Sequence, residues 1–175
     1  KKNLTGNTNE NIISKKNYVL IDDLAKIDEY LKEAEEIGEI CIDTETTSLN
    51  PHEANLVGIS LSVKTGHACY IPVGHKNNDN LDEKRVLQVL KPVLQDSSIK
   101  KIGQNIKFDF IVLYKRGIQM NSLEDTMLMS YVLDAGKNRH NMDTLSKIHL
   151  NHSPIAYKDI VGSGKKQINF SDVKI

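Results

Sequence analysis

The sequence predicts an α/β domain built on a mixed sheet, and three observations lead to this fold class. Three apolar, strand-like segments follow one another along the chain, which predicts an antiparallel meander over residues 39–43, 56–63 and 67–73. Helix–strand–helix units come next, and such units favour parallel additions to the same sheet. The 175 residues are 39% hydrophobic and 26% charged, a globular composition that fits one domain and excludes collagen-like, low-complexity and wholly disordered chains.

The first elements follow from composition and spacing. Residues 1–16 are polar and lack an apolar period, so we expect a linker there and a domain over residues 17–175. A short strand over residues 18–21 is expected to lead into a helix that Asp22 or Asp23 caps, with apolar positions at helical spacing. The strand at residues 39–43 carries apolar residues on both faces, which predicts a central strand covered on both sides.

The later elements are mainly helices. The apolar positions of residues 82–95 recur at helical spacing, and residues 99–102 form a short strand that ends at Gly103. A helix over residues 105–116 stops at Gly117. We expect two further helices, then a basic loop, and finally an element that is interrupted near its start; they cover residues 123–134, 142–150, 162–166 and 170–175.

Charge and cysteine usage narrow the class of protein. The 23 basic and 23 acidic residues balance, but the acidic excess lies in the first 60 residues and a basic excess lies near the C-terminus. A basic surface for duplex DNA over the whole molecule is therefore not expected, although an acidic metal site and a basic phosphate contact are possible. Cys41 and Cys69 lie in apolar segments and are expected as buried free thiols, which favours a cytoplasmic location. No segment has the length and apolarity of a membrane span.

Two carboxylates end the predicted central strand. Asp43 and Glu45 are two residues apart, so their side chains point to the same face, at the strand edge where open α/β sheets bind ligands. Two neighbouring like charges are costly to bury unless a cation shares them, and carboxylate oxygens suit Mg²⁺ or Mn²⁺. An Asp-x-Glu pattern by itself also fits two solvated acids at a strand end.

A second polar pair opens the helix over residues 105–116. Asn105 and Asp109 are one helical turn apart and share a face, next to the apolar Phe108. Asn105 is also a suitable N-cap residue, and an acid in the first turn is stabilised by the helix dipole, so the pair alone is a weak signal.

The order of several motifs resembles one known family. The motifs are Asp43-Thr-Glu-Thr, Gln104-Asn-Ile-Lys-Phe-Asp109, Glu124-Asp-Thr-Met-Leu, Arg139-His-Asn-Met-Asp-Thr-Leu and Ile168-Asn-Phe170. Together they resemble the 3′–5′ proofreading exonuclease domain of bacterial DNA polymerase I, a family A polymerase, over residues 17–175. The resemblance implies a ribonuclease H-like fold, with helices on both faces of a mixed sheet. It also implies two-metal hydrolysis of nucleotides from a single-stranded DNA 3′ end, and a polymerase domain in the same parent chain.

The resemblance assigns roles to individual residues. Asp43, Glu45 and Asp109 match the carboxylates that hold two divalent ions, Mg²⁺ or Mn²⁺. Matches to substrate-binding positions are Leu49, which wedges by the terminal base, Gln104 and Asn105 near the last nucleotides, Arg139 on a phosphate, and Tyr157, which stacks on the base. Outside the family context Leu49 and Tyr157 fit ordinary packing, and Arg139 fits a surface charge.

One family motif is missing from the sequence. The family places a Tyr-x-x-x-Asp motif after the basic loop, and its Asp completes the ligands of one metal. The only such pattern here starts at Tyr18, before the first motif, and the chain ends at Ile175. We therefore interpret the sequence as a piece that ends before this motif, with three of the four expected carboxylates, and expect little activity from the piece alone.

Two alternatives to the proofreading nuclease remain open. The piece could serve only as a DNA-binding or structural module of a polymerase, or it could belong to an RNA-trimming exonuclease of the same superfamily. Other motifs indicate less: Asp159 occupies the position where a Walker loop ending at Gly164-Lys165 would need glycine, and His149 with His152 fits surface histidines better than a metal pair.

Overall fold

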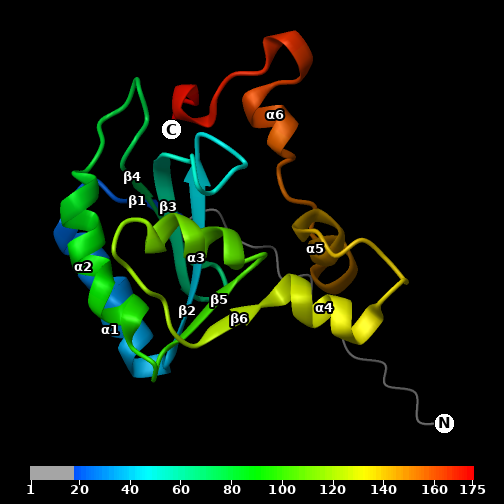
Figure 1. Cartoon of the computed structure of the whole chain (residues 1–175), viewed down its shortest axis with the longest axis horizontal. Helices are drawn as coiled ribbons and strands as arrows, with labels where there is room; N and C mark the ends of the chain where they lie inside the picture. Colours follow the sequence, from blue (N-terminus) through cyan, green and yellow to red (C-terminus); the bar gives the residue numbers. More distant parts are fainter. Residues whose placement is uncertain (1–17) are drawn as a thin grey trace.

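The computed structural model describes residues 18–175 and contains the predicted mixed sheet. Its six strands lie in the order β1-β4-β3-β2-β5-β6, as Figure 1 shows in part. The strands are β1 (Tyr18–Leu20), β2 (Glu39–Thr46), β3 (Leu56–Lys64), β4 (His67–Pro72), β5 (Lys100–Gly103) and β6 (Leu123–Asp125). The helices are α1 (Ile27–Ile37), α2 (Glu83–Gln95), α3 (Lys107–Tyr114), α4 (Thr126–Asp134), α5 (Met142–Leu150) and α6 (Tyr157–Val161). The linker expected for residues 1–16 lies outside the described residues.

The strand pairing confirms the predicted topology. β3 runs antiparallel to both β2 and β4, which gives the meander, while β5 and β6 extend the sheet in parallel from β2. β1 pairs with β4 in parallel at the other edge. In Figure 1, α1 and α2 lie side by side on one side of the sheet, and α4, α5 and α6 lie toward its other side. No helix of residues 18–175 has the length and apolarity to cross a bilayer.

The core lies between the sheet and the α1–α2 layer. Apolar side chains from α1, α2, α3 and the central strands form one cluster in which Ile27, Ile59 and Leu90 are fully buried. The N-cap of the first helical turn is Asp23, whose carboxylate accepts from Ala25 N–H. The sheet thus has one firmly packed face, and the polar residues that could carry chemistry lie outside this packed core.

The opposite face of β2 differs from the prediction. Ile40, Ile42 and Thr44 are buried, but Cys41 and Asp43 between them are exposed, so the expected cover on both faces of this strand is wrong. Cys69 is buried as expected, whereas the prediction of a buried Cys41 thiol is wrong. A strand with one exposed face normally alternates apolar and polar residues. Because Cys41 is apolar although it is exposed, this alternation is absent from the sequence at that position.

Two element boundaries also differ from the prediction. Residues 123–125, expected as the start of a helix, form β6 because they pair with β5, and α4 begins only at Thr126. Asp125 caps α4 by accepting from the backbone N–H groups of Met127 and Leu128. The helix expected from residue 105 begins at Lys107, because Asn105 adopts a left-handed φ of 58°.

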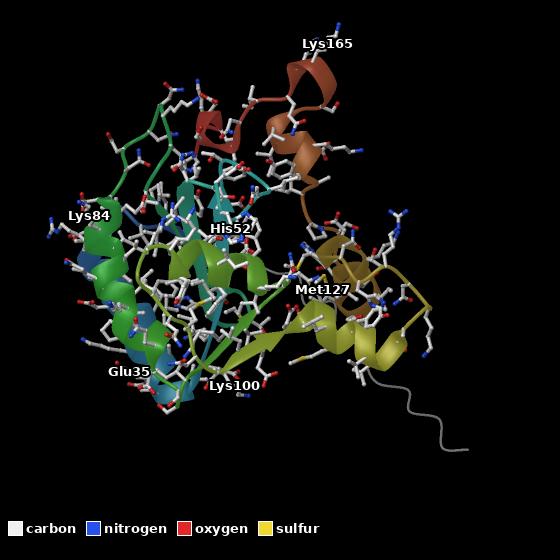
Figure 2. The ribbon with its side chains drawn as sticks, in the orientation of Figure 1. Glu35, His52, Lys84, Lys100, Met127 and Lys165 are labelled. Carbon is white, nitrogen blue, oxygen red and sulfur yellow. The ribbon has the colours of Figure 1, made fainter. Side chains whose placement is uncertain are left out.

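The segment after α5 contains short turns. Residues 157–161 form the short helix α6, which was not predicted. Residues Gly164–Lys166 and Phe170–Asp172 form 3₁₀ turns, the first within the predicted basic loop and the second within the predicted C-terminal element. Figure 2 shows Lys165 at the outer tip of this segment, pointing away from the sheet. His149 and His152 are exposed, as expected for surface histidines.

A buried lysine closes the C-terminal end of α2. Lys101 has 0% exposure, and its Nζ donates to the backbone oxygens of Val93, Asp96 and Ile99. Carbonyls at the end of a helix lack partners inside the helix, so the ammonium group satisfies them and meets the negative end of the helix dipole. The long side chain therefore joins β5 to α2.

Lys101→Met is expected to lower the free energy of unfolding by about 3 kcal/mol, because it buries several carbonyls without a donor. Urea unfolding followed by circular dichroism measures the loss. Lys100→Met is the matched control, since Lys100 is exposed at the end of the sheet (Figure 2) and should change stability by less than about 0.5 kcal/mol. Equal stability of the two variants would contradict the capping role.

Candidate active site

Two carboxylates lie next to each other on the open face of β2. Asp43 and Glu45 alternate with the buried Thr44, as the predicted common face requires. In the antiparallel ladder Asp43 is opposite Ser60 and Glu45 is opposite Gly58, and the register shifts between Glu45 and Thr46. β2 extends to Thr46, so both acids lie within the strand and the ladder fixes their spacing.

A third carboxylate reaches the same place from α3. Asp109 is in the first turn of α3 and is 2% exposed. Its Oδ1 accepts from the backbone N–H of Thr44 at 2.8 Å and from Thr44 Oγ1 at 2.6 Å. Two hydrogen bonds to the residue between Asp43 and Glu45 therefore join parts of the chain that are 65 residues apart. They fix one oxygen of Asp109 and leave the other free.

Burial raises the pKa of all three acids, and the charge of a neighbouring carboxylate adds to the shift. Burial, and secondarily the charge of Glu45, raises the pKa of Asp43 to about 6. Burial and the charge of Asp109 raise the pKa of Glu45. Burial raises the pKa of Asp109 to about 6, against the opposing effect of the Thr44 hydrogen bonds. Asp43 keeps contact with solvent, but the walls of the cleft around it displace enough water to disfavour the charged form.

The donor chemistry suits a hard divalent cation. Within residues 18–175, no ion pair with a lysine, arginine or histidine neutralises Asp43, Glu45 or Asp109. A cation would relieve their repulsion, and carboxylate oxygens are the ligands that Mg²⁺ and Mn²⁺ prefer. However, in the described part of the chain no three His, Cys, Asp or Glu side chains form a group that could hold a metal ion as they stand. The residues fit the cation in charge and ligand type, but they do not by themselves form a complete set of metal ligands.

The pH dependence of stability follows from these raised pKa values. Asp43 and Asp109 titrate near pH 6 in the folded protein and near 3.8 when unfolded, so the folded state binds more protons between these values. The stability that their protonated forms contribute is therefore fully present below about pH 3.8 and is lost as pH rises through about 6.

Asp43→Asn is accordingly expected to stabilise the metal-free protein at pH 8 by about 1 kcal/mol, a value reduced for the solvent contact of Asp43. At pH 4 the gain should vanish, because Asp43 is then protonated in the folded wild type. Urea unfolding in the presence of a chelator measures both values. An equal gain at the two pH values would point to packing and would contradict the electrostatic explanation.

Most of the predicted site residues line one cleft of about 360 Å³. The predicted residues in its wall are Asp43, Glu45, Leu49, Gln104, Asn105, Asp109 and Tyr157. Leu49 is 94% exposed at the rim, and Tyr157 is 53% exposed. Arg139 does not line the cleft and lies exposed between α4 and α5. A larger cavity of about 710 Å³ lies between α3 and α4, but its walls are mainly apolar and contain none of the three clustered acids.

Gln104 and Asn105 are held in different ways. The Gln104 side chain donates from Nε2 to His140 O at 2.7 Å, and its Oε1 accepts from Thr126 Oγ1 at 2.6 Å. Gln104 thus braces the loop that carries Arg139, next to His140. Asn105 is exposed, and its backbone N–H donates to Asp125 Oδ1 at 3.0 Å, so the alternative interpretation of Asn105 as an N-cap is wrong.

An aromatic wall faces the carboxylates. Tyr157 stacks on Phe170 with ring centroids 6.2 Å apart and an angle of 13° between the planes. Asn169 fixes this wall to the loop after β2 through a hydrogen bond from Nδ2 to Thr47 O at 2.9 Å. Phe170 had no predicted role, although the Ile168-Asn-Phe170 motif drew attention to the segment. Phe108 and Gln167 also line the cleft and were not predicted as site residues.

Comparison with known proteins gives consistent matches. A family model described as 3′–5′ exonuclease matches residues 18–174. DNA polymerase I of Rhizobium leguminosarum is 42% identical over 178 residues, and that of Pseudomonas aeruginosa is 42% identical over 168. Each alignment covers 90% of this chain but 18% of the relative. The chain therefore spans about a fifth of the length of these curated relatives.

Solved structures share the fold. Brucella melitensis NrnC with bound Mg²⁺ is 25% identical, with a TM-score of 0.59 over 79% of this chain and 62% of that chain. Trypanosoma brucei RNase D is 14% identical, with a TM-score of 0.67 over 86% of this chain and 53% of that chain. Escherichia coli RNase D gives a TM-score of 0.64 at 19% identity, over 82% and 36% of the two chains. These likenesses confirm the ribonuclease H-like fold that the sequence predicted.

Proposed function

This chain belongs to the 3′–5′ exonuclease family of DNA polymerase I, and on that premise we propose that it hydrolyses the last phosphodiester of a single-stranded DNA 3′ end with the help of two divalent ions. The observation that carries the proposal is the meeting of Asp43, Glu45 and Asp109 at one cleft, through the Thr44 hydrogen bonds. The acids have no cationic partner within residues 18–175, and an aromatic wall lies opposite them.

The carboxylates supply charge and position. Asp43, Glu45 and Asp109 would hold the divalent ions, which when bound stabilise the charge that develops on the phosphate and on the leaving oxygen. Thr44 keeps Asp109 Oδ1 in place, so the free Asp109 oxygen faces a defined direction. Water attacks phosphorus and gives up a proton, the bond to the 3′ oxygen breaks, and the 3′ oxygen takes up a proton, so that a nucleoside 5′-monophosphate and a shortened strand with a 3′ hydroxyl result.

Other residues, in the cleft and beside it, bind the strand. One face of the Tyr157 ring stacks on the terminal base, and Phe170 packs against the other face of the Tyr157 ring. Leu49 offers an apolar contact at the rim, and Arg139, braced through Gln104 and His140, reaches a phosphate further along the strand. Stacking combined with phosphate contacts binds single strands without sequence preference, as a nuclease that trims any 3′ end requires.

The rest of the site belongs to the parent protein. Because the polymerase relatives are about five times longer, we propose that this chain is part of a DNA polymerase and packs beside its polymerase domain. A further carboxylate from a Tyr-x-x-x-Asp segment after residue 175 would close the metal ligand set. Residues 1–175 alone are then expected to bind metal weakly and to show little activity.

An RNA-trimming nuclease is the second candidate. The fold is like that of Escherichia coli RNase D, which is an exoribonuclease, and this likeness fits the second candidate. The 42% identity to DNA polymerase I over 90% of the chain outweighs the lower identity of that structure.

The proposal is tested by the direction in which the full-length parent protein degrades a strand, and by its preference for DNA or RNA. A single-stranded oligonucleotide labelled at its 5′ end, incubated with Mg²⁺, should shorten one nucleotide at a time from the 3′ end. An RNA strand of the same sequence should react more slowly. Internal cleavage or degradation from the 5′ end would refute the exonuclease assignment, and faster RNA degradation would favour the second candidate.

A further inference from the structure

A tyrosine–histidine pair lies behind the carboxylate cleft. The hydroxyl of Tyr70, from β4, is 2.7 Å from Nε2 of His75, which is 4% exposed. Nδ1 of His75 is 3.0 Å from the backbone oxygen of Val173. Since a carbonyl oxygen only accepts, Nδ1 carries the hydrogen and Nε2 accepts from the Tyr70 hydroxyl. Both rings are therefore fixed in direction.

The Tyr70 hydroxyl lies over Gly58, the ladder partner of Glu45. Gly58 is the partner of Glu45 in the β2–β3 ladder, so side chains at the two positions would lie on the same face. A Cβ atom at Gly58 would lie 2.0 Å from the Tyr70 hydroxyl oxygen, which means that Tyr70 fills the space of the absent side chain. Burial and the charge of Glu45 raise the pKa of Tyr70, which agrees with this closeness.

His75 connects the same pair to the aromatic wall. Its ring centroid is 6.0 Å from that of Phe170, which supports Tyr157. Three of the further hydrogen bonds that tie the segment after Phe170 to the loop after β4 come from Lys76 and Asn78. These are Lys76 N–H to Ser171 O at 2.8 Å, Asn78 Nδ2 to Val173 O at 3.3 Å, and Lys76 Nζ to Asp172 Oδ2 at 2.9 Å. One buried imidazole thus contacts Phe170 of the aromatic wall and the Tyr70 hydroxyl, which lies over the ladder partner of Glu45.

We propose that Tyr70 and His75 are positioning residues that hold Glu45 and the Tyr157–Phe170 wall at a fixed separation across the cleft. The inference rests on the proposed function. Because the Tyr70 hydrogen is committed to His75, the hydroxyl does not donate to Glu45, and the carboxylate oxygens stay free for a cation or a water. If Tyr70 only packed against its neighbours, the ring would be sufficient. Removal of the hydroxyl therefore distinguishes a packing role from the positioning role.

Tyr70→Phe keeps the ring and removes the hydroxyl. In the full-length parent protein it is expected to lower kcat for single-stranded DNA about tenfold, the size typical for a partner that orients a metal ligand, while KM changes less than about twofold. His75→Phe should lower kcat about as much and also raise KM about fivefold, because it releases the aromatic wall as well. His75→Gln can accept from Tyr70 and donate to Val173, and it should bring both constants within about threefold of the wild type.

Tyr30→Phe is the matched control. Tyr30 is buried, whereas Tyr70 is half-buried, and the Tyr30 hydroxyl donates to Ala68 O in β4 from α1, on the packed face of the sheet. It should cost as much in melting temperature as Tyr70→Phe and leave kcat and KM unchanged. If Tyr70→Phe behaves like Tyr30→Phe in kcat while Asp43→Asn is inactive, the positioning proposal is overturned. If Asp43→Asn keeps wild-type activity, the proposed function itself fails.

Hydrogen exchange without metal gives a readout that does not depend on activity. In the full-length protein, His75→Phe should speed exchange of the backbone amides at residues 168–173 at least about tenfold, because it removes an anchor of that segment. Tyr30→Phe and His75→Gln should leave this exchange near the wild-type rate. Unchanged exchange in His75→Phe would show that His75 does not hold the wall and would overturn that part of the proposal.

Discussion

Asp43→Asn in the full-length protein is expected to lower the rate of Mg²⁺-dependent 3′-end hydrolysis by about 10³-fold, the effect of losing about 4 kcal/mol of transition-state stabilisation. Asp43 precedes Thr44, which binds Asp109, and lies next to Glu45 on the open face of β2. Asparagine keeps the shape of the side chain but removes one of the three charges that would bind the ions. Release of nucleotides from a labelled single strand measures the rate.

The control for Asp43→Asn is Glu53→Gln, which removes an exposed charge from the nearby loop before β3. It should leave the rate within about twofold of the wild type, because exposed charges interact weakly. Urea unfolding in the presence of a chelator separates inactivity from loss of the fold, since metal-free Asp43→Asn should be more stable than the metal-free wild type at pH 8. A stable Asp43→Asn variant with the wild-type rate would contradict the assignment of Asp43 as a metal ligand.

Asp109→Asn is expected to have an effect of similar size, about 10³-fold. The amide oxygen can still accept from Thr44 N–H and Oγ1, so the fold and the position of the side chain should persist while the charge is lost. The same assay measures the loss, and increasing the Mn²⁺ concentration should restore part of the activity if the defect is weaker metal binding.

Thr44→Val provides the comparison for Asp109→Asn. It removes one of the two hydrogen bonds to Asp109 and keeps all three charges. We expect a loss of about tenfold, because the backbone N–H of Thr44 still holds Asp109 Oδ1. A greater loss in Thr44→Val than in Asp109→Asn would mean that position, rather than charge, is the main contribution of Asp109.

The parts of the fold that were predicted correctly depend on local patterns. The alternation of apolar residues gave the meander, and the two-residue spacing of Asp43 and Glu45 gave their common face. β6 was missed because its three residues adjoin the apolar pattern of α4, and strand pairing with β5 overrides that pattern. The exposure of Cys41 was missed because its side chain is apolar although its face of the sheet is open.

The parts of the site that were missed depend on distant contacts. His75 and Val173 are 98 residues apart, and Asn169 and Thr47 are 122 apart, so no local spacing signals these hydrogen bonds. The role of Gln104 as a substrate contact stays a prediction, while its hydrogen bonds with His140 and Thr126 had no sequence signal, because only the fold brings these residues together. The convergence of Asp109 on Thr44 had the motif order as its only sequence signal.

Anomalous diffraction from crystals of the full-length protein soaked in Mn²⁺ is the most direct test of the shared cation site. We predict a manganese peak within coordination distance, about 2.2 Å, of carboxylate oxygens of Asp43 and Glu45, with Asp109 facing the same cluster. Manganese bound elsewhere, with these three acids free of metal at saturating Mn²⁺, would contradict the shared site.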